Sequence, residues 1–283
     1  MSVPAPTIDQ PGEVRDAIGP GFDRFVTPES MQFGERLLDR VDLRPGIRLL
    51  DVAAGSGAVA LPAARRGADV VAIDQTATIV DRLVARARAS GLPSLEAQVM
   101  DGTRVDLPDD SFDVCISLNG VSLFPDLGGG LREMARVTRP AGRVLVAGFG
   151  EPQRVEFLGY FLGALQATVD DFTPLPMDSP TVPFQVADPR ELRRRLVTAG
   201  WADVRVETVT WDMHFSSGAH LWNVVTSSNP IGVALTAGLT HDQTRAVQHV
   251  LDGMLRERSG GEPGAVLYAE MHIGIGTVPP HHT

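Results

Sequence analysis

Between residues 47 and 149, short apolar runs alternate with stretches of helical periodicity, and this alternation restricts the fold more than any other feature of the chain. Strands that alternate with helices in this way assemble into a parallel sheet covered by helices on both faces. We therefore predict an α/β chain with a Rossmann-like, mostly parallel sheet. The expected strands are 47–52, 69–73, 96–100, 112–118 and 143–147, and the expected helices are 58–66, 76–90 and 131–138.

The segments on either side of this stretch have other patterns. Residues 1–20 are rich in proline and glycine and are expected to form a flexible arm, and one or two helices should follow between 22 and 41. Residues 151–170 are apolar on two faces, which predicts a helix packed on two sides. Further on we expect a proline-rich loop at 172–186, helices at 189–199, 220–227 and 240–258, and strands at 204–213 and 265–274.

The composition excludes several classes of function. The formal net charge is −10 and no basic run occurs, so binding to nucleic acid, which depends on neutralising phosphates, is not expected. All 25 basic residues are arginine, which excludes Schiff-base chemistry on a lysine, and the single Cys115 excludes an intrachain disulfide. No apolar run approaches the roughly 20 residues that span a bilayer, and no signal peptide is expected. We therefore predict a cytoplasmic protein without membrane contact.

The chemistry centres on residues 49–57, where an apolar strand reaches Asp51 and continues into a turn of small residues that includes Gly55 and Gly57. Small residues let the backbone approach a ligand closely, and the helix that follows presents free N–H groups. The next strand ends in Asp74, 23 residues after Asp51. A carboxylate in that position can accept both hydroxyl groups of a ribose. These features predict a cofactor that contains adenosine.

Two kinds of adenosine cofactor remain open at this point. Gly55, Gly57 and Ala60 also fit the glycine pattern of NAD sites. Asp51, however, would repel the charges of a pyrophosphate, whereas S-adenosylmethionine (SAM) carries a positive sulfonium and a positive ammonium group that an acidic cleft suits. Downstream, Asp101 closes the third strand and can accept from the adenine amino group. SAM is therefore the favoured cofactor.

The series continues with Gly102, with Asn119 at the end of the fourth strand, and with the run from Leu131 to Gly142. With this series, residues 45–150 resemble the class I SAM-dependent methyltransferases of the type-11 group, which is similar to the ubiquinone, menaquinone and natural-product methyltransferases. The resemblance implies a seven-stranded sheet whose last strand, 265–274, runs antiparallel beside the fifth. It also implies cofactor contacts at Asp51, Ala53, Gly55, Gly57, Asp74, Gln75, Asp101, Gly102 and Asn119.

One position departs from the family pattern, which has glycine where this chain has Ala53. Alanine is tolerated there if its backbone φ angle is negative. With the segments around it, the resemblance divides the chain into four parts. These are an N-terminal arm with lid helices (1–44), a SAM-binding core (45–150), a cap that selects the substrate and holds the sixth strand (151–235), and a last helix and antiparallel strand that complete the sheet (236–283).

The residues that would act on the substrate have weaker signals. His214 and His220 flank the end of a late strand and are candidate general bases, and no histidine spacing predicts a metal site. Cys115 lies in an apolar strand and is expected to be a core residue. Aromatic residues that could contact a substrate are Phe25, Phe124, Phe157, Phe161 and Trp222.

The sequence thus predicts direct in-line transfer of a methyl group from SAM to an O, N or C nucleophile of a small, partly apolar molecule. Two alternatives stay open, an NAD-dependent oxidoreductase and a non-catalytic protein that keeps the SAM fold as a partner subunit. A homodimer is a further expectation.

Overall fold

A computed structural model describes residues 21–170, 172, 184–228 and 230–280 of the chain. The arm expected at 1–20 lies outside these residues, as does most of the proline-rich loop expected at 172–186. The described residues divide into two compact units. We call them the sheet unit, with residues from 30–155, 176–211 and 268–283, and the helical unit, with residues from 1–29, 156–175 and 212–267. The four parts expected along the sequence, 1–44, 45–150, 151–235 and 236–283, stay a prediction.

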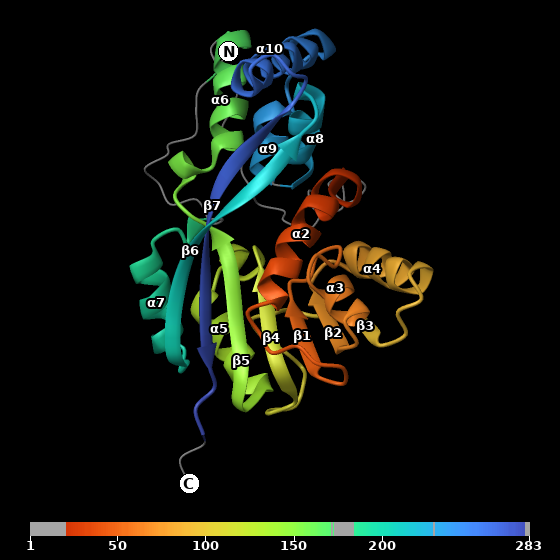
Figure 1. Ribbon diagram of the computed structural model, residues 1–283, viewed down its shortest axis with the longest axis vertical. Helices are drawn as coiled ribbons and strands as arrows, with labels where there is room; N and C mark the ends of the chain where they lie inside the picture. Colours follow the sequence, from red (N-terminus) through yellow and green to blue (C-terminus); the bar gives the residue numbers. More distant parts are fainter. Residues whose placement is uncertain (1–20, 171, 173–183, 229, 281–283) are drawn as a thin grey trace. The chain divides into compact units, whose positions relative to one another are not determined.

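A seven-stranded sheet has the strand order β3-β2-β1-β4-β5-β7-β6 (Figure 1). The first five strands in this order pair in parallel, and β7 pairs antiparallel with β5, from Arg143 opposite Thr277 to Phe149 opposite Met271. Both the Rossmann-like sheet and its antiparallel last strand are therefore confirmed. The strands are β1 (Arg48–Val52), β2 (Asp69–Asp74), β3 (Leu95–Val99), β4 (Phe112–Leu118), β5 (Thr138–Phe149), β6 (Ala202–Phe215) and β7 (Ala265–Thr277).

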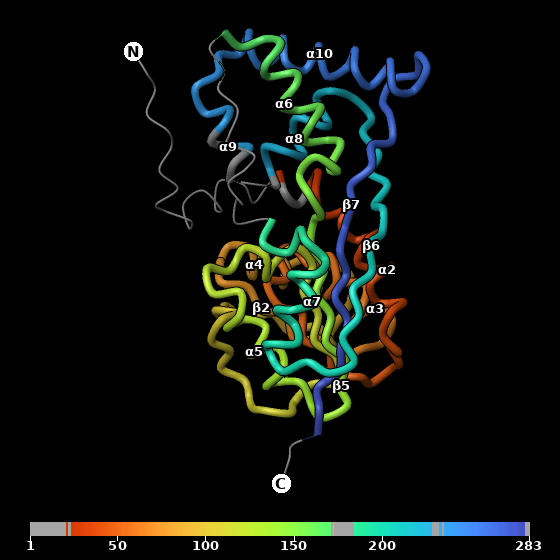
Figure 2. Tube along the Cα trace, turned by 90° about the vertical axis from the view of Figure 1, so that its left-hand side faces the viewer, coloured from red at the N-terminus to blue at the C-terminus, as the bar shows by residue number. Residues whose placement is uncertain are grey.

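Helices cover this sheet on both faces. Figure 2 shows α5 and α7 on one side of the sheet and α2 and α3 on the other. The segment that follows α7 is held to α5 by the indole N–H of Trp201, which donates to the carbonyl of Leu131 over 3.1 Å. The helices are α2 (Thr27–Leu38), α3 (Ala60–Arg65), α4 (Ala77–Ala89), α5 (Leu127–Val137) and α7 (Pro189–Thr198).

The core of the sheet unit consists of the apolar residues that face the helices. Leu50, Val52, Val144 and Cys115 are fully buried, so the expectation that Cys115 is a core residue is confirmed. Burial also raises the pKa of the Cys115 thiol well above its usual value, because the interior disfavours a thiolate.

The helical unit contains η1 (Phe22–Val26), α6 (Glu156–Thr168), α8 (Gly218–Ser228), α9 (Pro230–Thr236) and α10 (His241–Ser259). α6 packs against α10 and α8, which confirms that its two apolar faces are both covered. α10 begins with a capping box, in which Thr240 and Gln243 satisfy each other's backbone N–H groups, and it ends at Gly260 in the left-handed conformation.

Several elements extend beyond their expected limits. α5 begins at Leu127, before the predicted start at 131, because Asp126 accepts from the N–H of Gly129 and compensates for three consecutive glycines. β5 continues through Pro140 and Gly142, and β6 continues past residue 213 to Phe215. α9 is not predicted by the sequence pattern.

Candidate functional site

Three acidic residues follow three neighbouring strands of the sheet unit. Asp51 lies near the end of β1, Asp74 ends β2, and Asp101 comes two residues after β3. These strands are adjacent and parallel, with Asp51 opposite Ala72 and Asp74 opposite Val99. The three residues therefore belong to the same edge of the sheet, where ligands of open α/β folds bind.

Asp51 is almost completely buried, with 1% of its surface exposed. Its Oδ2 accepts a hydrogen bond of 2.9 Å from the N–H of Ala60, the first residue of α3. The pKa of this carboxyl is raised to about 8, chiefly by burial; the hydrogen bond from the Ala60 N–H opposes the shift, and the negative charge of Asp74 adds to it. The carboxyl of Asp51 therefore occupies the start of α3 and is held mostly protonated at neutral pH.

Asp74 ties the turn after β1 to the end of β2. Its Oδ2 accepts from the N–H of Gly55 over 3.1 Å, and its Oδ1 accepts from the N–H of Thr76 over 3.0 Å. Gln75 is exposed beside it. The carboxylate thus fixes the backbone of the turn that the sequence identifies as the cofactor loop.

The conformation of that turn corrects one expectation. Ala53 has a φ of +55°, so it does not have the negative angle that would make alanine unstrained in place of glycine. Gly55 and Gly57 also have positive φ angles, of +54° and +95°. At Gly57 a Cβ would lie 2.5 Å from Leu83 of α4, so this glycine serves helix packing.

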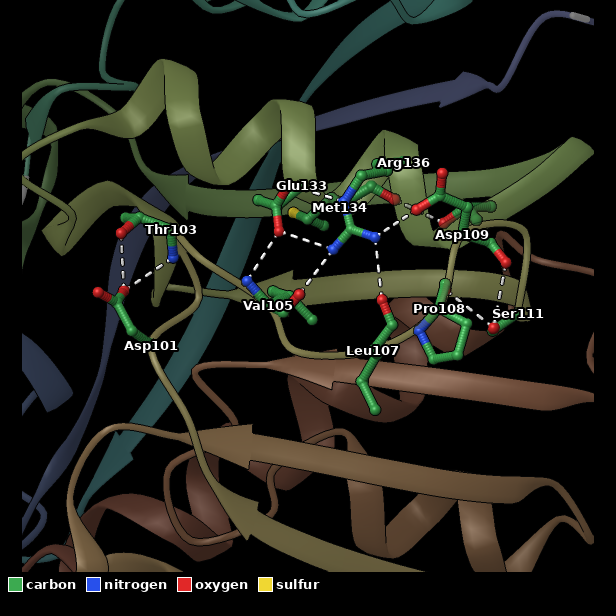
Figure 3. Close-up of polar contacts among 11 residues, drawn as sticks. Asp101, Thr103, Val105, Leu107, Pro108, Asp109, Ser111, Glu133, Met134 and Arg136 are labelled. Carbon is green, nitrogen blue, oxygen red and sulfur yellow. Dashed lines mark hydrogen bonds and ion pairs between the residues drawn. The ribbon is translucent and has the colours of Figure 1, made fainter.

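Asp101 begins a tight local turn. Its Oδ1 accepts from both the N–H and the hydroxyl of Thr103, each over 2.8 Å (Figure 3). The next residue, Gly102, is buried, and a Cβ there would lie 2.5 Å from the ring of Phe124. A Cβ on Gly130 of α5 would likewise lie 2.5 Å from the ring of Phe124. The structure therefore brings Phe124 to the Asp101–Gly102 turn.

An arginine and glutamate pair, which sequence reasoning missed, holds the segment after Asp101. Arg136 donates to the carbonyls of Val105 and Leu107 over 2.7 and 2.9 Å, and it forms a two-point ion pair with Glu133 (Figure 3). Glu133 also accepts from the N–H of Val105, and its pKa is lowered, chiefly by Arg136. Both residues lie in the run from Leu131 to Gly142. The pattern of this run supports the resemblance to the methyltransferase family but does not indicate which groups the two side chains bind.

Asn119 closes β4 with a buried polar atom. It has a φ of +57°, and its N–H donates to Ala147. Its side-chain Oδ1 is buried and has no hydrogen-bond partner among the described residues. Ser117, also missed by sequence reasoning, joins β4 to β1 because its hydroxyl donates to the carbonyl of Val52 over 2.7 Å. An orphaned acceptor next to this edge is where a ligand donor would be stabilised.

The other candidates lie in the helical unit. His220 is half-buried, and its ring lies 6.2 Å from that of Phe25 and 5.8 Å from that of Phe215. Phe161 and Trp222 form a buried ring pair at 5.5 Å, and Phe157 is buried beside Phe215. His214 is exposed on β6. The roles of these residues toward a substrate stay predictions.

The tautomer of His220 limits its use as a base. Its Nδ1 accepts from the N–H of Ser216 over 3.2 Å, so the proton of the neutral ring lies on Nε2. Burial lowers the pKa of the ring, and the charge of Glu29 opposes this. A neutral His220 in this state therefore donates through Nε2.

Two features of the described residues bear on other functions. None of their His, Cys, Asp and Glu side chains gather in groups of three that could hold a metal ion. No helix in the described part of the chain has both the length and the apolar character needed to cross a membrane.

Comparisons with known proteins agree with the geometry. The family described as "Methyltransferase domain" matches residues 50–146. Nocamycin O-methyltransferase from Saccharothrix syringae is 38% identical over 171 residues, which cover 59% of this chain and 58% of that protein. The chain thus spans only about half to three fifths of the length of the first curated relatives it matches.

The alignment with a second relative covers more of that protein's length. Demethylmenaquinone methyltransferase from Corynebacterium efficiens is 29% identical over 209 residues, which cover 69% of this chain and 87% of that protein. Among solved structures, the cyclase SpnF superposes with a TM-score of 0.62 at 16% identity, covering 99% of this chain and all of that one. The likeness to SpnF concerns the fold alone.

Proposed function

We propose, from the premise that residues 50–146 form a methyltransferase domain, that this protein transfers a methyl group from SAM to a small-molecule acceptor. The observation that carries the proposal is that Asp51, Asp74 and Asp101 lie at or just beyond the ends of the adjacent strands β1, β2 and β3, on one edge of the sheet. A cationic sulfonium and ammonium group suit an acidic edge of this kind.

The residues of this edge fit the parts of SAM. Asp74, which already orients the turn through Gly55, would hold the ribose hydroxyls, with Gln75 beside it. Asp101 would accept from the adenine amino group, with Phe124 against the neighbouring Gly102 as an apolar wall. The orphaned Oδ1 of Asn119 would accept from a donor of the cofactor, and Asp51, neutral and bonded to the N–H of Ala60, would support the cofactor turn without supplying a charge.

The same geometry disfavours NAD. A pyrophosphate in a dinucleotide site binds to the free N–H groups at the start of the first helix. Here the N–H of Ala60 at the start of α3 donates to the buried carboxyl of Asp51. An acidic residue therefore takes the place that a phosphate needs, which supports SAM over the dinucleotide.

Bound SAM supplies the reactive methyl group, and the protein supplies orientation and electrostatics. Alignment of two reactants can contribute about 7–11 kcal/mol to lowering a barrier, so a general base is optional. The contacts of the acceptor with aromatic residues and with His214 or His220 stay predictions. The relative from Saccharothrix syringae is named as an O-methyltransferase, which favours oxygen as the accepting atom.

The experiment that tests the proposal is titration of the protein with SAM, with its demethylated product and with NADH by calorimetry. We expect both sulfur nucleosides to bind and NADH not to bind; binding of NADH alone would favour the oxidoreductase. Methyl transfer from labelled SAM to a panel of phenols, alcohols and amines then tests the reaction. SAM binding without transfer to any of them would favour a non-catalytic partner protein. The cytoplasmic location and the homodimer stay predictions.

A further inference from the structure

Gln185 lies more than sixty positions along the chain after the turn that follows β4, yet its side chain contacts that turn directly. Its side-chain Nε2 donates to the carbonyl of Ser122 over 2.9 Å and to the carbonyl of Phe124 over 3.0 Å. One amide group thus uses both of its hydrogens on two carbonyls of the same turn. The turn comprises η2 (Val121–Leu123) and the residues on either side of it.

This turn links Asn119 and Phe124, two residues of the predicted SAM site that add to its carboxylates. At its beginning, the carbonyl of Asn119 accepts from the hydroxyl of Ser122, so the backbone of Asn119 is tied to the turn. At its end, the ring of Phe124 lies on Gly102, next to Asp101. A shift of the turn would therefore move both Asn119 and the apolar wall at the predicted adenine position.

The segment that carries Gln185 is itself firmly anchored. Val186 is buried in the core, and its side chain fills the space over Gly148, where a Cβ would lie 2.4 Å from it. The carbonyl of Ala187 lies 2.8 Å from Nε2 of the buried His272, whose Nδ1 lies 3.0 Å from the hydroxyl of Thr208. The backbone around Gln185 is therefore held in place, so the side chain of Gln185 can stabilise the turn.

From these contacts we propose that Gln185 is a positioning residue for the cofactor site, which holds the Asn119–Phe124 turn in the conformation that binds SAM. The proposal rests on the proposed function, because it assigns Gln185 to the same site. It adds a residue that has no motif and lies outside the stretch 50–146 that matches the methyltransferase family.

Two substitutions separate this role from general stability. Gln185→Glu keeps the size of the side chain but places a carboxylate oxygen against two carbonyl oxygens, whereas Gln185→Leu only removes the donors. Loss of two hydrogen bonds should raise the Kd for SAM about tenfold in Gln185→Leu and further in Gln185→Glu at pH 8. The carbonyl oxygens of Ser122 and Phe124 disfavour an ionised side chain and should raise the pKa of the introduced carboxyl above its ordinary value of about 4.3. At pH 5 a protonated Glu can then donate one hydrogen, so Gln185→Glu should recover part of the affinity relative to Gln185→Leu. Gln153→Leu, at an exposed glutamine of the same unit, is the matched control and should bind like the unaltered protein.

Hydrogen exchange supplies a readout that does not depend on SAM. The N–H groups of Leu123 and Phe124 donate within the turn, and the N–H of Val121 donates to the hydroxyl of Ser117 in β4. All three should exchange at least severalfold faster in both Gln185 variants than in the Gln153 control. Faster exchange together with weaker SAM binding supports the proposal. Unchanged exchange, or faster exchange with an unchanged Kd, overturns it while the proposed function stands. If the unaltered protein binds no SAM, the proposed function fails and this proposal falls with it.

Discussion

The side chain of Ala53 packs against the backbone of Gly120, so closely that a Cβ on Gly120 would lie 2.4 Å from the Cβ of Ala53. Ala53 is in the left-handed conformation, in which the Cβ of an L-residue is strained. The absent side chain at 120 therefore makes room for the methyl group that replaces a family glycine. The two positions at the ends of neighbouring strands are sterically coupled.

We expect Ala53→Gly to stabilise the protein by about 1 kcal/mol, because relief of the left-handed strain outweighs the added freedom of the unfolded chain. Chemical denaturation measures the change. Ala58→Gly is the control: its φ is not positive, so it should lower stability by up to about 1 kcal/mol. A stability of Ala53→Gly below that of the unaltered protein would contradict the strain at this position.

Gly120→Ala should destabilise the protein by about 1–3 kcal/mol, since the new methyl group also approaches Ser117 Oγ at 2.9 Å. In the Ala53→Gly background the cost should be smaller but not zero, because the Ser117 contact remains. A double-mutant cycle measures the coupling. Additive effects of the two substitutions would show that the close approach of Ala53 and Gly120 has no energetic consequence.

Asp74→Asn should weaken SAM binding at least tenfold, which is about 1.4 kcal/mol. The substitution removes the negative charge and one of the two oxygens that accept from Gly55 and Thr76, so the turn and the predicted ribose contact are both affected. Calorimetric titration with SAM checks this. Asp69→Asn, at the exposed start of the same strand, should leave the Kd unchanged. Equal affinities of the two variants would remove Asp74 from the site.

The sequence predicts the sheet well, because the periodicity of apolar residues and the alternation of strands with helices are local properties of the chain. It also predicts that Asp51, Asp74 and Asp101 lie at the ends of the first three strands along the chain, since strand ends can be read from apolar runs. It does not predict the φ of Ala53 or the contacts of Gln185 and Arg136, because these depend on tertiary neighbours. The early start of α5 is missed for a related reason: the cap at Asp126 overrides the poor helix propensity of three glycines.

The buried carboxyl of Asp51 should make stability depend on pH. Its pKa is about 8 in the folded protein and near 3.8 when unfolded, so between these values the folded state binds the extra proton. Stability from this group is complete below about pH 4 and is lost as pH rises toward 8, by about 1.4 kcal/mol per pH unit. Denaturation of the unaltered protein and of Asp51→Asn at pH 5, 6 and 7 isolates the contribution, because all other groups are shared. Parallel pH profiles of the two proteins would be evidence against a protonated Asp51.

Arg136 should hold the segment from Val105 to Asp109 in its folded conformation. Its guanidinium donates to the carbonyls of Val105 and Leu107, and it pairs with Glu133 and, over 2.5 Å, with Asp109. About a third of the Arg136 side chain is exposed, which weakens its ion pairs through solvent screening, so the carbonyl contacts carry most of the effect. We expect Arg136→Ala to lower stability by about 2 kcal/mol and to weaken SAM binding, because the segment continues from the Asp101 turn.

A matched arginine on the same helix tests this assignment. Arg132 is 60% exposed and lies 3.8 Å from its partner Asp126, so Arg132→Ala should change stability by less than about 0.5 kcal/mol. Denaturation and SAM titration are run on both variants, and Glu133→Gln provides a third measurement. Glu133→Gln keeps one acceptor for the N–H of Val105 but loses the charge, so its effect should fall between the other two. If Arg136→Ala were as stable as Arg132→Ala, the segment would be held by the backbone turn at Asp101 and Thr103, and not by α5.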